Sequence, residues 1–304
     1  MNETAKIKKH VQEAKKEKRG MGMKTKNKIS NITVYVILTI ISIIWIAPFV
    51  CLLLESLRVE ELGKGPVGYL IPKEWGIDNY VNLFKTTKFP KWFLNTFLTG
   101  LAVAVIQTVM VLTMSYTLSR LRFKGRKLLM NVMLILGMFP GFLTLILLKK
   151  VLGDFDLIGA NSMFGLILVY CASSGMGYYV SKGFFDTIPR SLDEAARIDG
   201  ATRMQVFFKV TLPLAKPIVI YTILTAFMAP WGDFMLAKFL ANNASDGMNV
   251  AVGLQNMIGE KGNLATQYTM FCAAGIVVAI PITVLFLLLQ KYYVEGVTGG
   301  AVKG

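Results

Sequence analysis

The chain has 304 residues, of which 54% are hydrophobic and only 17% are charged, and its net charge is +15. Its mean hydropathy of +0.53 excludes a disordered chain and disfavours an ordinary soluble enzyme, because soluble domains hold about 25% charged residues. The single histidine, His10, excludes a histidine-based catalytic triad and a multi-histidine metal site. The sequence therefore indicates no catalytic residue and no set of metal ligands.

The order of apolar and charged stretches predicts an all-α membrane protein with six transmembrane helices. A helix needs about twenty mostly apolar residues to cross a bilayer, and its backbone amides must be satisfied within the lipid. Five stretches meet this length without a charge, and a sixth carries Lys216, Asp233 and Lys238. The expected spans are 32–54, 93–119, 128–148, 158–181, 214–240 and 264–290. We expect a basic tail at 1–31, a six-span domain at 32–290 and a glycine-rich, flexible tail at 291–304.

The charges divide unevenly between the two sides of this topology. Segments 1–31, 120–127, 182–216 and 291–304 hold 23 Lys and Arg against 8 acidic residues, whereas the remaining segments hold 10 of each. Positive charge accumulates on the cytoplasmic side of membrane proteins, so both termini are expected in the cytoplasm. This bias accounts for the net positive charge of a chain that lies in a lipid bilayer, so we expect no nucleic-acid partner.

The basic tail and the first outer loop each allow two interpretations. The tail at 1–31 is either solvated and disordered or lies on anionic headgroups. The outer loop at 55–92 contains an amphipathic helical pattern, formed by Ile77, Tyr80, Val81 and Phe84. That helix is expected to lie on the membrane surface, with contact to an external partner as the alternative, and Trp75 and Trp92 fit the aromatic belt at the interface.

The loop at 184–212 carries the strongest local signals. Ser191 and Glu194 have the spacing of a capping box that starts a helix, and Gly200 stands where that helix should end. Thr202 and Gln205 form a second capping box, which starts another helix. We therefore expect two short helices joined by a glycine turn, with small side chains on the first helix that let another surface approach closely.

The same loop resembles the EAA loop of ABC importer permeases, a family whose loop docks on a cytoplasmic ATPase and transmits its movement to the spans. The resemblance implies that coupling to the ATPase involves these residues: Glu194, Ala195, Ala196, Asp199, Gly200 and Ala201. It also assigns the structure of the loop to Ser191, Thr202, Phe207 and Pro213.

The C-terminal segment 290–304 is similar to the tail of the smaller permease of the maltose-type sugar transporters. This resemblance implies a subunit in a bacterial cytoplasmic membrane that passes an oligosaccharide, maltodextrin-like or related, from an extracellular binding protein. The implied partners are a second homologous permease and two copies of a cytoplasmic ABC ATPase. The chain lacks a G-x-x-x-x-G-K-[ST] motif, so we expect it to bind no cofactor and the ATPase to hold ATP and Mg²⁺.

Two further regions are candidates for contact with substrate or binding protein. Trp231, Asp233 and Phe234 lie on the possible substrate path, where aromatic and carboxylate groups could hold a sugar, and interfacial anchoring is the alternative. The third outer loop at 241–266 is rich in turn residues and is expected to be either a plain linker or, by the family resemblance, a contact to the binding protein.

Three other function classes compete with the sugar permease. A permease for a non-sugar solute is disfavoured by the C-terminal tail. A secondary transporter that works without ATP would require internal repeats and buried ionisable pairs, and five of the expected spans hold no charge. A membrane enzyme would require a catalytic cluster within the spans, and the sequence offers none.

Overall fold

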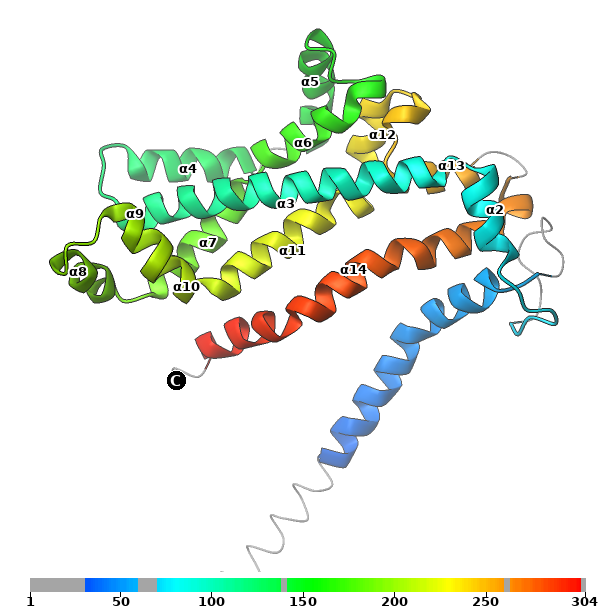
Figure 1. Ribbon diagram of the computed structural model, residues 1–304, viewed down its shortest axis with the longest axis horizontal. Helices are drawn as coiled ribbons and strands as arrows, with labels where there is room; N and C mark the ends of the chain where they lie inside the picture. Colours follow the sequence, from blue (N-terminus) through cyan, green and yellow to red (C-terminus); the bar gives the residue numbers. More distant parts are fainter. Residues whose placement is uncertain (1–30, 60–69, 138–140, 260–262, 302–304) are drawn as a thin grey trace, which may run out of the picture. The chain divides into compact units, whose positions relative to one another are not determined.

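The computed structural model describes residues 31–59, 70–137, 141–259 and 263–301 (Figure 1). The chain divides into two units, Met1–Leu54 and Glu55–Gly304, which we describe separately. The described part of the first unit belongs to one helix, Asn31–Ser56, which is long and apolar enough to cross a membrane. This helix agrees with the expected span at 32–54, whereas residues 1–30 of the basic tail lie outside the described residues.

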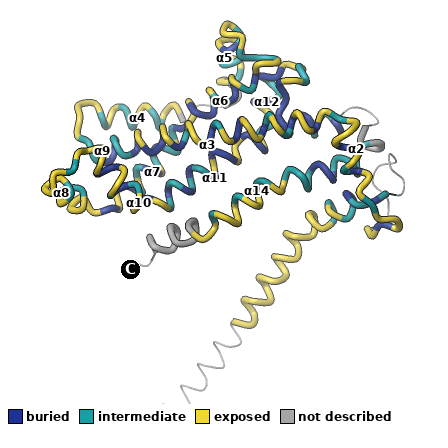
Figure 2. The backbone as a smooth tube through the Cα atoms, in the orientation of Figure 1, coloured by how far each residue is buried: buried dark blue, intermediate teal, exposed yellow. Residues whose placement is uncertain are grey.

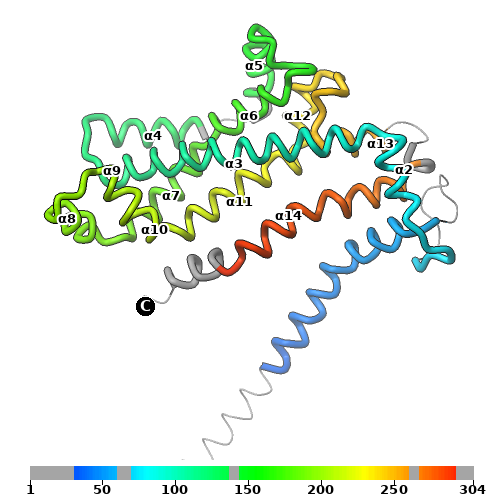
Figure 3. The backbone as a smooth tube through the Cα atoms, in the orientation of Figure 1, coloured from blue at the N-terminus to red at the C-terminus, as the bar shows by residue number. Residues whose placement is uncertain are grey.

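The core of the second unit is built on three long helices. Helix α3 (Phe89–Arg120) packs along α11 (Lys216–Gly232), which also contacts α14 (Asn263–Ala301), although these helices are far apart in the sequence (Figure 3). A Cβ atom at Gly100 would lie 2.9 Å from the carbonyl oxygen of Phe227. The missing side chain thus lets α3 and α11 approach closely, as small residues do where membrane helices cross.

The regular elements of the described residues are helices, apart from one isolated β-bridge between Arg58 and Trp75. Three of these helices are long and apolar enough to span a bilayer: Asn31–Ser56, Phe89–Arg120 and Gln267–Lys291. Two more pairs of helices qualify only if a sharp bend of 107° or 82° is allowed within one span. The described residues therefore supply between three and five crossing segments, and the six uninterrupted spans expected from the sequence are not all present as single helices.

One of the expected spans is divided within the described residues. The stretch at 158–181 falls largely on α6 (Ser162–Ala172) and α7 (Gly175–Thr187). The stretch at 128–148 includes α4 (Arg126–Gly137), part of α5 (Gly141–Asp154) and residues 138–140, which lie outside the described residues. Glycine weakens a helix, and serine hydroxyls compete for its backbone carbonyls. The Ser174 hydroxyl, for example, donates to the carbonyl of Cys171 at 2.7 Å, just where α6 ends.

The weaker span at 214–240 is also interrupted. Helix α11 ends at Gly232, and α12 (Met235–Ala241) follows after Asp233. The Asp233 carboxylate accepts a hydrogen bond from the Leu236 amide at 3.1 Å, so it stabilises the start of α12. Asp233, which the sequence places toward one end of this expected span, therefore lies at the break between α11 and α12.

The loops of the second unit gather at two ends, as the sequence predicts for alternating spans. One end holds the turn between α3 and α4, helices α8 to α10 and the C-terminal end of α14 (Figure 1). The other end holds α2 (Asp78–Thr86), α13 (Val250–Gly259) and the start of α3. The 3₁₀ turns η1 (Gly159–Asn161) and η3 (Ser245–Gly247) contact each other, which joins the segment before α6 to the third outer loop.

The first outer loop contains the expected helix, α2, which packs on the unit through a different face, so contact of its apolar face with the membrane stays a prediction. Asn79 and Leu83 are buried, whereas Ile77 and Phe84 of the predicted apolar face are exposed. The Asn79 amide donates to the carbonyls of Ser56 and Arg58, and its oxygen accepts from the Thr269 hydroxyl. A polar residue is therefore buried here because its hydrogen bonds are satisfied.

Trp92 is also placed differently from the prediction, because it is buried in the core rather than exposed at the membrane interface. Its ring covers Gly253 of α13, a helix within the third outer loop. That loop is therefore neither a plain linker nor mainly turns. The Asn249 side chain accepts a hydrogen bond from the Val252 amide at 2.9 Å and so caps the start of α13. An asparagine before an apolar stretch is a signal for a helix start, but here it stands among many turn-forming residues.

The C-terminal segment departs from the expected flexible tail, since α14 continues to Ala301. Once a helix has formed, each added residue gains a backbone hydrogen bond. This gain offsets the cost of placing glycine in a helix, which is about 1 kcal/mol per glycine relative to alanine. The last residues of the segment, 302–304, lie outside the described residues.

Candidate functional site

The loop between α7 and α11 folds as a helical hairpin at one end of the second unit (Figure 1). Its first arm is α8 (Arg190–Ile198). Its second arm runs through α9 (Arg203–Val206), the π turn η2 (Phe207–Thr211) and α10 (Leu212–Leu214). We call this segment the 190–214 hairpin.

The turn of the hairpin has the conformation that the sequence predicts. Gly200 has a φ of +87°, a region that favours glycine. Its amide donates to the carbonyl of Arg197 at 3.1 Å, and the Ala201 amide donates to the carbonyl of Ala196 at 2.9 Å. These two bonds form a Schellman motif, which satisfies the last carbonyls of α8 and fixes the direction of the second arm.

One of the two predicted capping boxes is present. The Gln205 amide donates to the Thr202 hydroxyl at 3.3 Å, and the Thr202 amide donates to the Gln205 side chain at 2.8 Å. The box predicted from Ser191 is wrong, because α8 begins at Arg190, two residues before the expected start at Leu192, with the extended Pro189 as its cap. Ser191 therefore lies within the first turn rather than before it.

A largely buried ion pair joins the hairpin to α3. The Arg120 Nε atom lies 2.9 Å from Oδ2 of Asp193, with side chains 5% and 13% exposed. The other carboxylate oxygen accepts from the Thr211 hydroxyl at 3.1 Å. Asp193 thus connects both arms of the hairpin to the end of a helix that runs the length of the unit.

Further polar contacts surround this ion pair. Arg120 donates to the carbonyl of Ile188 at 2.9 Å, and Arg190 donates to the carbonyl of Ser119 at 3.0 Å. The Asp186 carboxylate accepts from both Ser119 and Lys182. Burial favours the neutral acid, but these hydrogen bonds outweigh it and hold the pKa of Asp186 below its ordinary value of 3.8.

An apolar contact complements the polar ones on the second arm. Phe207, which the sequence assigns to the structure of the loop, is buried, and its ring lies 4.7 Å from that of Tyr116 on α3. It belongs to a cluster that includes Phe185 and Ile188, next to the first arm, and Ile218 of α11. The hairpin is therefore packed against α3, α7 and α11, whereas Pro213 is exposed.

The opposite surface of the hairpin is open to solvent. Every residue of α8 is at least partly exposed, including Glu194, Ala195 and Ala196 (Figure 2). Asp199 and Gly200 are exposed too, and Ala201 is half-buried. Large apolar side chains stand beside these small ones, with Ile198 86% and Met204 64% exposed. A small-residue surface flanked by exposed apolar side chains is suited to docking another protein.

A hollow of about 520 Å³ lies beside the first arm. Its lining is mostly cationic and consists of Arg120, Leu121, Arg122, Arg190, Asp193, Glu194, Arg197 and Arg203. Sequence reasoning identified Glu194 but missed Arg120, Asp193 and Thr211. The arginine directly after an apolar span and the aspartate in the first turn of a helix were visible signals, but nothing in the sequence paired them.

The three residues on the possible substrate path lie apart from the hairpin. Trp231 is buried, with its ring 5.4 Å from that of Phe93, whereas Asp233 and Phe234 are half-buried. The Asp233 carboxylate accepts from the Tyr170 hydroxyl at 2.6 Å as well as from the Leu236 amide. Much of the hydrogen-bonding capacity of Asp233 is thus engaged within the chain.

Comparison with known sequences matches residues 111–299 to the family of binding-protein-dependent transport system inner membrane components. The chain is 36% identical over 286 residues to the maltodextrin transport system permease protein MdxG of Bacillus subtilis, covering 93% of this chain and 100% of that protein. It is 35% identical over 239 residues to the galactooligosaccharides transport system permease protein GanQ of the same species, covering 77% and 83%.

Solved structures with a similar fold come from bacterial alginate transporters. One chain, from an ABC transporter involved in the import of the acidic polysaccharide alginate, has a TM-score of 0.74 and 22% identity, with 88% of this chain and 98% of that chain covered. A second, from the alginate transporter in complex with an alginate pentasaccharide-bound periplasmic protein, has a TM-score of 0.58 and 16% identity, covering 87% and 95%.

Proposed function

Because the chain belongs to the family of binding-protein-dependent transport system inner membrane components, we propose that it is a permease subunit of an ATP-binding cassette importer for an oligosaccharide. Relatives named for maltodextrin and galactooligosaccharide transport support a sugar over a non-sugar solute. The chain is a multi-pass membrane protein and acts in transport rather than in catalysis. The observation that carries the proposal is the capped, solvent-exposed 190–214 hairpin that is bonded to α3.

The hairpin is the proposed docking site for a cytoplasmic ATPase. Its exposed Glu194, Ala195, Asp199 and Gly200 match the resemblance to the EAA loop, and Ile198 beside them offers apolar area to a partner. With the ATPase docked there, the hairpin end of the second unit would lie in the cytoplasm. The positive-inside bias of the sequence supports a cytoplasmic location for both termini as well. One ATPase copy meets this hairpin, and a second copy meets the corresponding loop of a homologous permease. ATP and Mg²⁺ are held by the ATPase pair.

Helix α3 is the proposed element that carries movement from the hairpin across the membrane. Its 32 residues are about 48 Å long, which exceeds the roughly 30 Å hydrocarbon core. At one end Arg120 holds the hairpin through Asp193. At the other end Asn95 donates to the carbonyls of Asp246 and Met248 in the third outer loop, at 2.9 and 3.0 Å.

This arrangement supports a contact between the third outer loop and an extracellular binding protein. The Val250 amide donates to the Thr96 hydroxyl of α3 at 2.7 Å, so the start of α13 moves with α3. A displacement of the hairpin by the ATPase thereby reaches the loop that receives the loaded binding protein. Within the spans, the half-buried Asp233 and Phe234 are the proposed sugar contacts, and the buried Trp231 supports them from the core.

The proposal is tested by purifying the tagged full chain from its native membrane and identifying the proteins that accompany it. We expect a second permease and a P-loop ATPase. In the Ile198→Glu variant the ATPase should be lost, because a buried charge at the docking surface is costly. Ile71→Glu changes another exposed isoleucine, 67% exposed, at the other end of the unit and should retain the ATPase. A chain that transports sugar alone would favour a secondary transporter instead.

A further inference from the structure

The turn between α3 and α4 concentrates positive charge at a membrane boundary. Arg122, Lys124 and Lys127 are exposed and make no ion pair with any residue that the structure describes. Arg126 is half-buried, and its charge contributes to the lowered pKa of Asp186 on α7. Asp186 itself accepts hydrogen bonds from Ser119 and Lys182, so most of the charge of the turn is not neutralised by the described residues.

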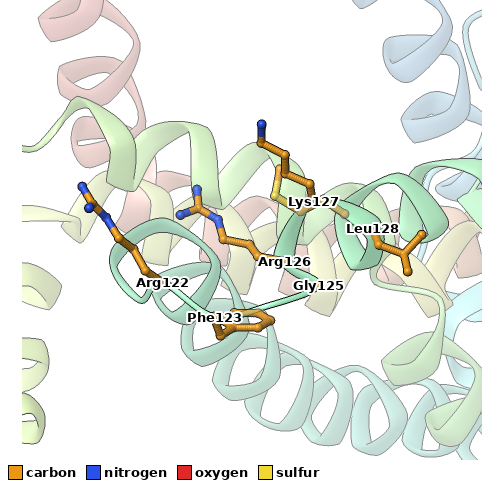
Figure 4. Close-up of a pocket in the computed structure, with 7 residues that line it drawn as sticks. Arg122, Phe123, Gly125, Arg126, Lys127 and Leu128 are labelled. Carbon is orange, nitrogen blue, oxygen red and sulfur yellow. The ribbon is translucent and has the colours of Figure 1, made fainter.

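The same turn exposes apolar side chains next to the cations. A hollow of about 590 Å³ is lined by Arg122, Phe123, Gly125, Arg126, Lys127, Leu128 and Met130. Phe123 is 43% and Leu128 69% exposed. In Figure 4 the side chains of Arg122, Arg126 and Lys127 extend toward one side of the turn, and the Phe123 ring lies on the other. One hollow thus offers both cationic and apolar surface.

The position of the turn relates this mixed surface to the bilayer. Helix α3 is apolar and longer than the hydrocarbon core, and α4 begins again with an apolar sequence directly after Lys127. The turn therefore lies where acyl chains give way to headgroups. The first turn of α4 contains no acidic residue, so its positive dipole end adds to the charge of the side chains.

We propose that the hollow at residues 122–130 binds the headgroup of an anionic phospholipid. The phosphate would lie among Arg122, Arg126 and Lys127, and the acyl chains would follow Phe123 and Leu128 toward the bilayer. A soluble anion would satisfy the cations but would leave the apolar side chains uncovered. An acidic protein segment would cover both, but it would have to enter the region where α4 meets the acyl chains.

The test places the photoreactive residue benzoylphenylalanine at position 123 of the full chain in its purified complex. The complex is inserted into nanodiscs that contain equal amounts of phosphatidylglycerol and phosphatidylcholine, each traceable by its own tag. We expect cross-linking to favour phosphatidylglycerol at least tenfold, since each of the three cations contributes about fivefold in affinity near an anionic surface. Inorganic phosphate at low concentration should leave this preference largely intact.

Matched charge variants decide whether the turn is responsible. R122Q/K127Q should reduce the preference by about an order of magnitude. K85Q/K88Q removes two exposed lysines at the other end of the unit and should not change it. If R122Q/K127Q does not assemble, raising the salt concentration on the native chain should reduce the preference instead, because the attraction is screened.

Three results would overturn the proposal. The first is equal labelling of the two lipids in the native background. The second is an unchanged preference in assembled R122Q/K127Q, or under high salt. The third is cross-linking to a protein subunit instead of lipid, or loss of labelling on adding low concentrations of phosphate. These readouts are independent of transport, so they remain informative if the proposed function fails.

Discussion

Replacing Asp193 with alanine removes the acceptor that holds both arms of the 190–214 hairpin to α3. The Arg120 side chain is only 5% exposed, so its charge would be left without the carboxylate that neutralises it. Breaking a buried ion pair from one side costs about 3 to 5 kcal/mol. Even the lower value raises the population of the detached hairpin by roughly a hundredfold.

Hydrogen exchange of the assembled protein measures this population directly. Backbone amides of the hairpin should exchange about a hundredfold faster in Asp193→Ala, and ATP hydrolysis should continue without matching sugar uptake. Asp199→Ala, which removes an exposed acid from the same hairpin, should change exchange by less than about threefold.

A double replacement tests whether the effect of Asp193→Ala comes from leaving the Arg120 charge without a partner. Arg120→Met combined with Asp193→Leu removes both charges and should restore most of the protection, because apolar residues of similar volume can replace a buried pair. Native exchange rates in Asp193→Ala would refute the assigned role of the ion pair.

Three further predictions concern a turn, a packing contact and an acid. Gly200→Val should lower uptake without loss of membrane insertion, because a β-branched side chain at a φ of +87° costs about 1–2 kcal/mol, whereas Gly200→Asn should cost less. Gly253→Ala should lower the free energy of unfolding, measured by thermal denaturation, by about 1–3 kcal/mol, because its Cβ would lie 2.1 Å from the Trp92 ring. Gly183→Ala should leave it unchanged, because a Cβ there would have no described atom within 4 Å. The pKa of Asp186 is lowered in the folded protein, so its carboxylate contributes fully to stability above pH 3.8. This contribution is lost as the pH falls through the pKa of the folded state. The difference in melting temperature between the native chain and Asp186→Asn should therefore narrow below pH 3.8.

The features that the sequence predicted correctly depend on neighbouring residues. The left-handed Gly200 and the box between Thr202 and Gln205 are decided within one or two helical turns, so their patterns are sufficient. The length of the apolar stretch that became α3 likewise predicts a single long helix. The alternation of apolar and charged stretches also predicts loops at two ends of the second unit, whereas the side assigned by the positive-inside bias stays a prediction.

The features that the sequence did not predict depend on distant partners. Arg120 and Asp193 pair only because the loop folds back onto the end of α3. Asn79 is buried because carbonyls from another segment accept its amide, and Trp92 is buried because α13 covers it. The cap predicted at Ser191 is an exception, because this error is local. Pro189 and Ser191 stand two residues apart, and both can precede a helix, but α8 starts after Pro189.

The central claim is that this chain forms the pathway of an ATP-driven oligosaccharide importer. Its most direct test is uptake of a labelled maltodextrin series into proteoliposomes that contain this chain, its co-purified permease and ATPase, and a loaded sugar-binding protein. We expect uptake that requires ATP and the binding protein together and that fails with Asp193→Ala. Uptake that proceeds without ATP, or a fully assembled complex that hydrolyses ATP but moves none of the oligosaccharides, would contradict it.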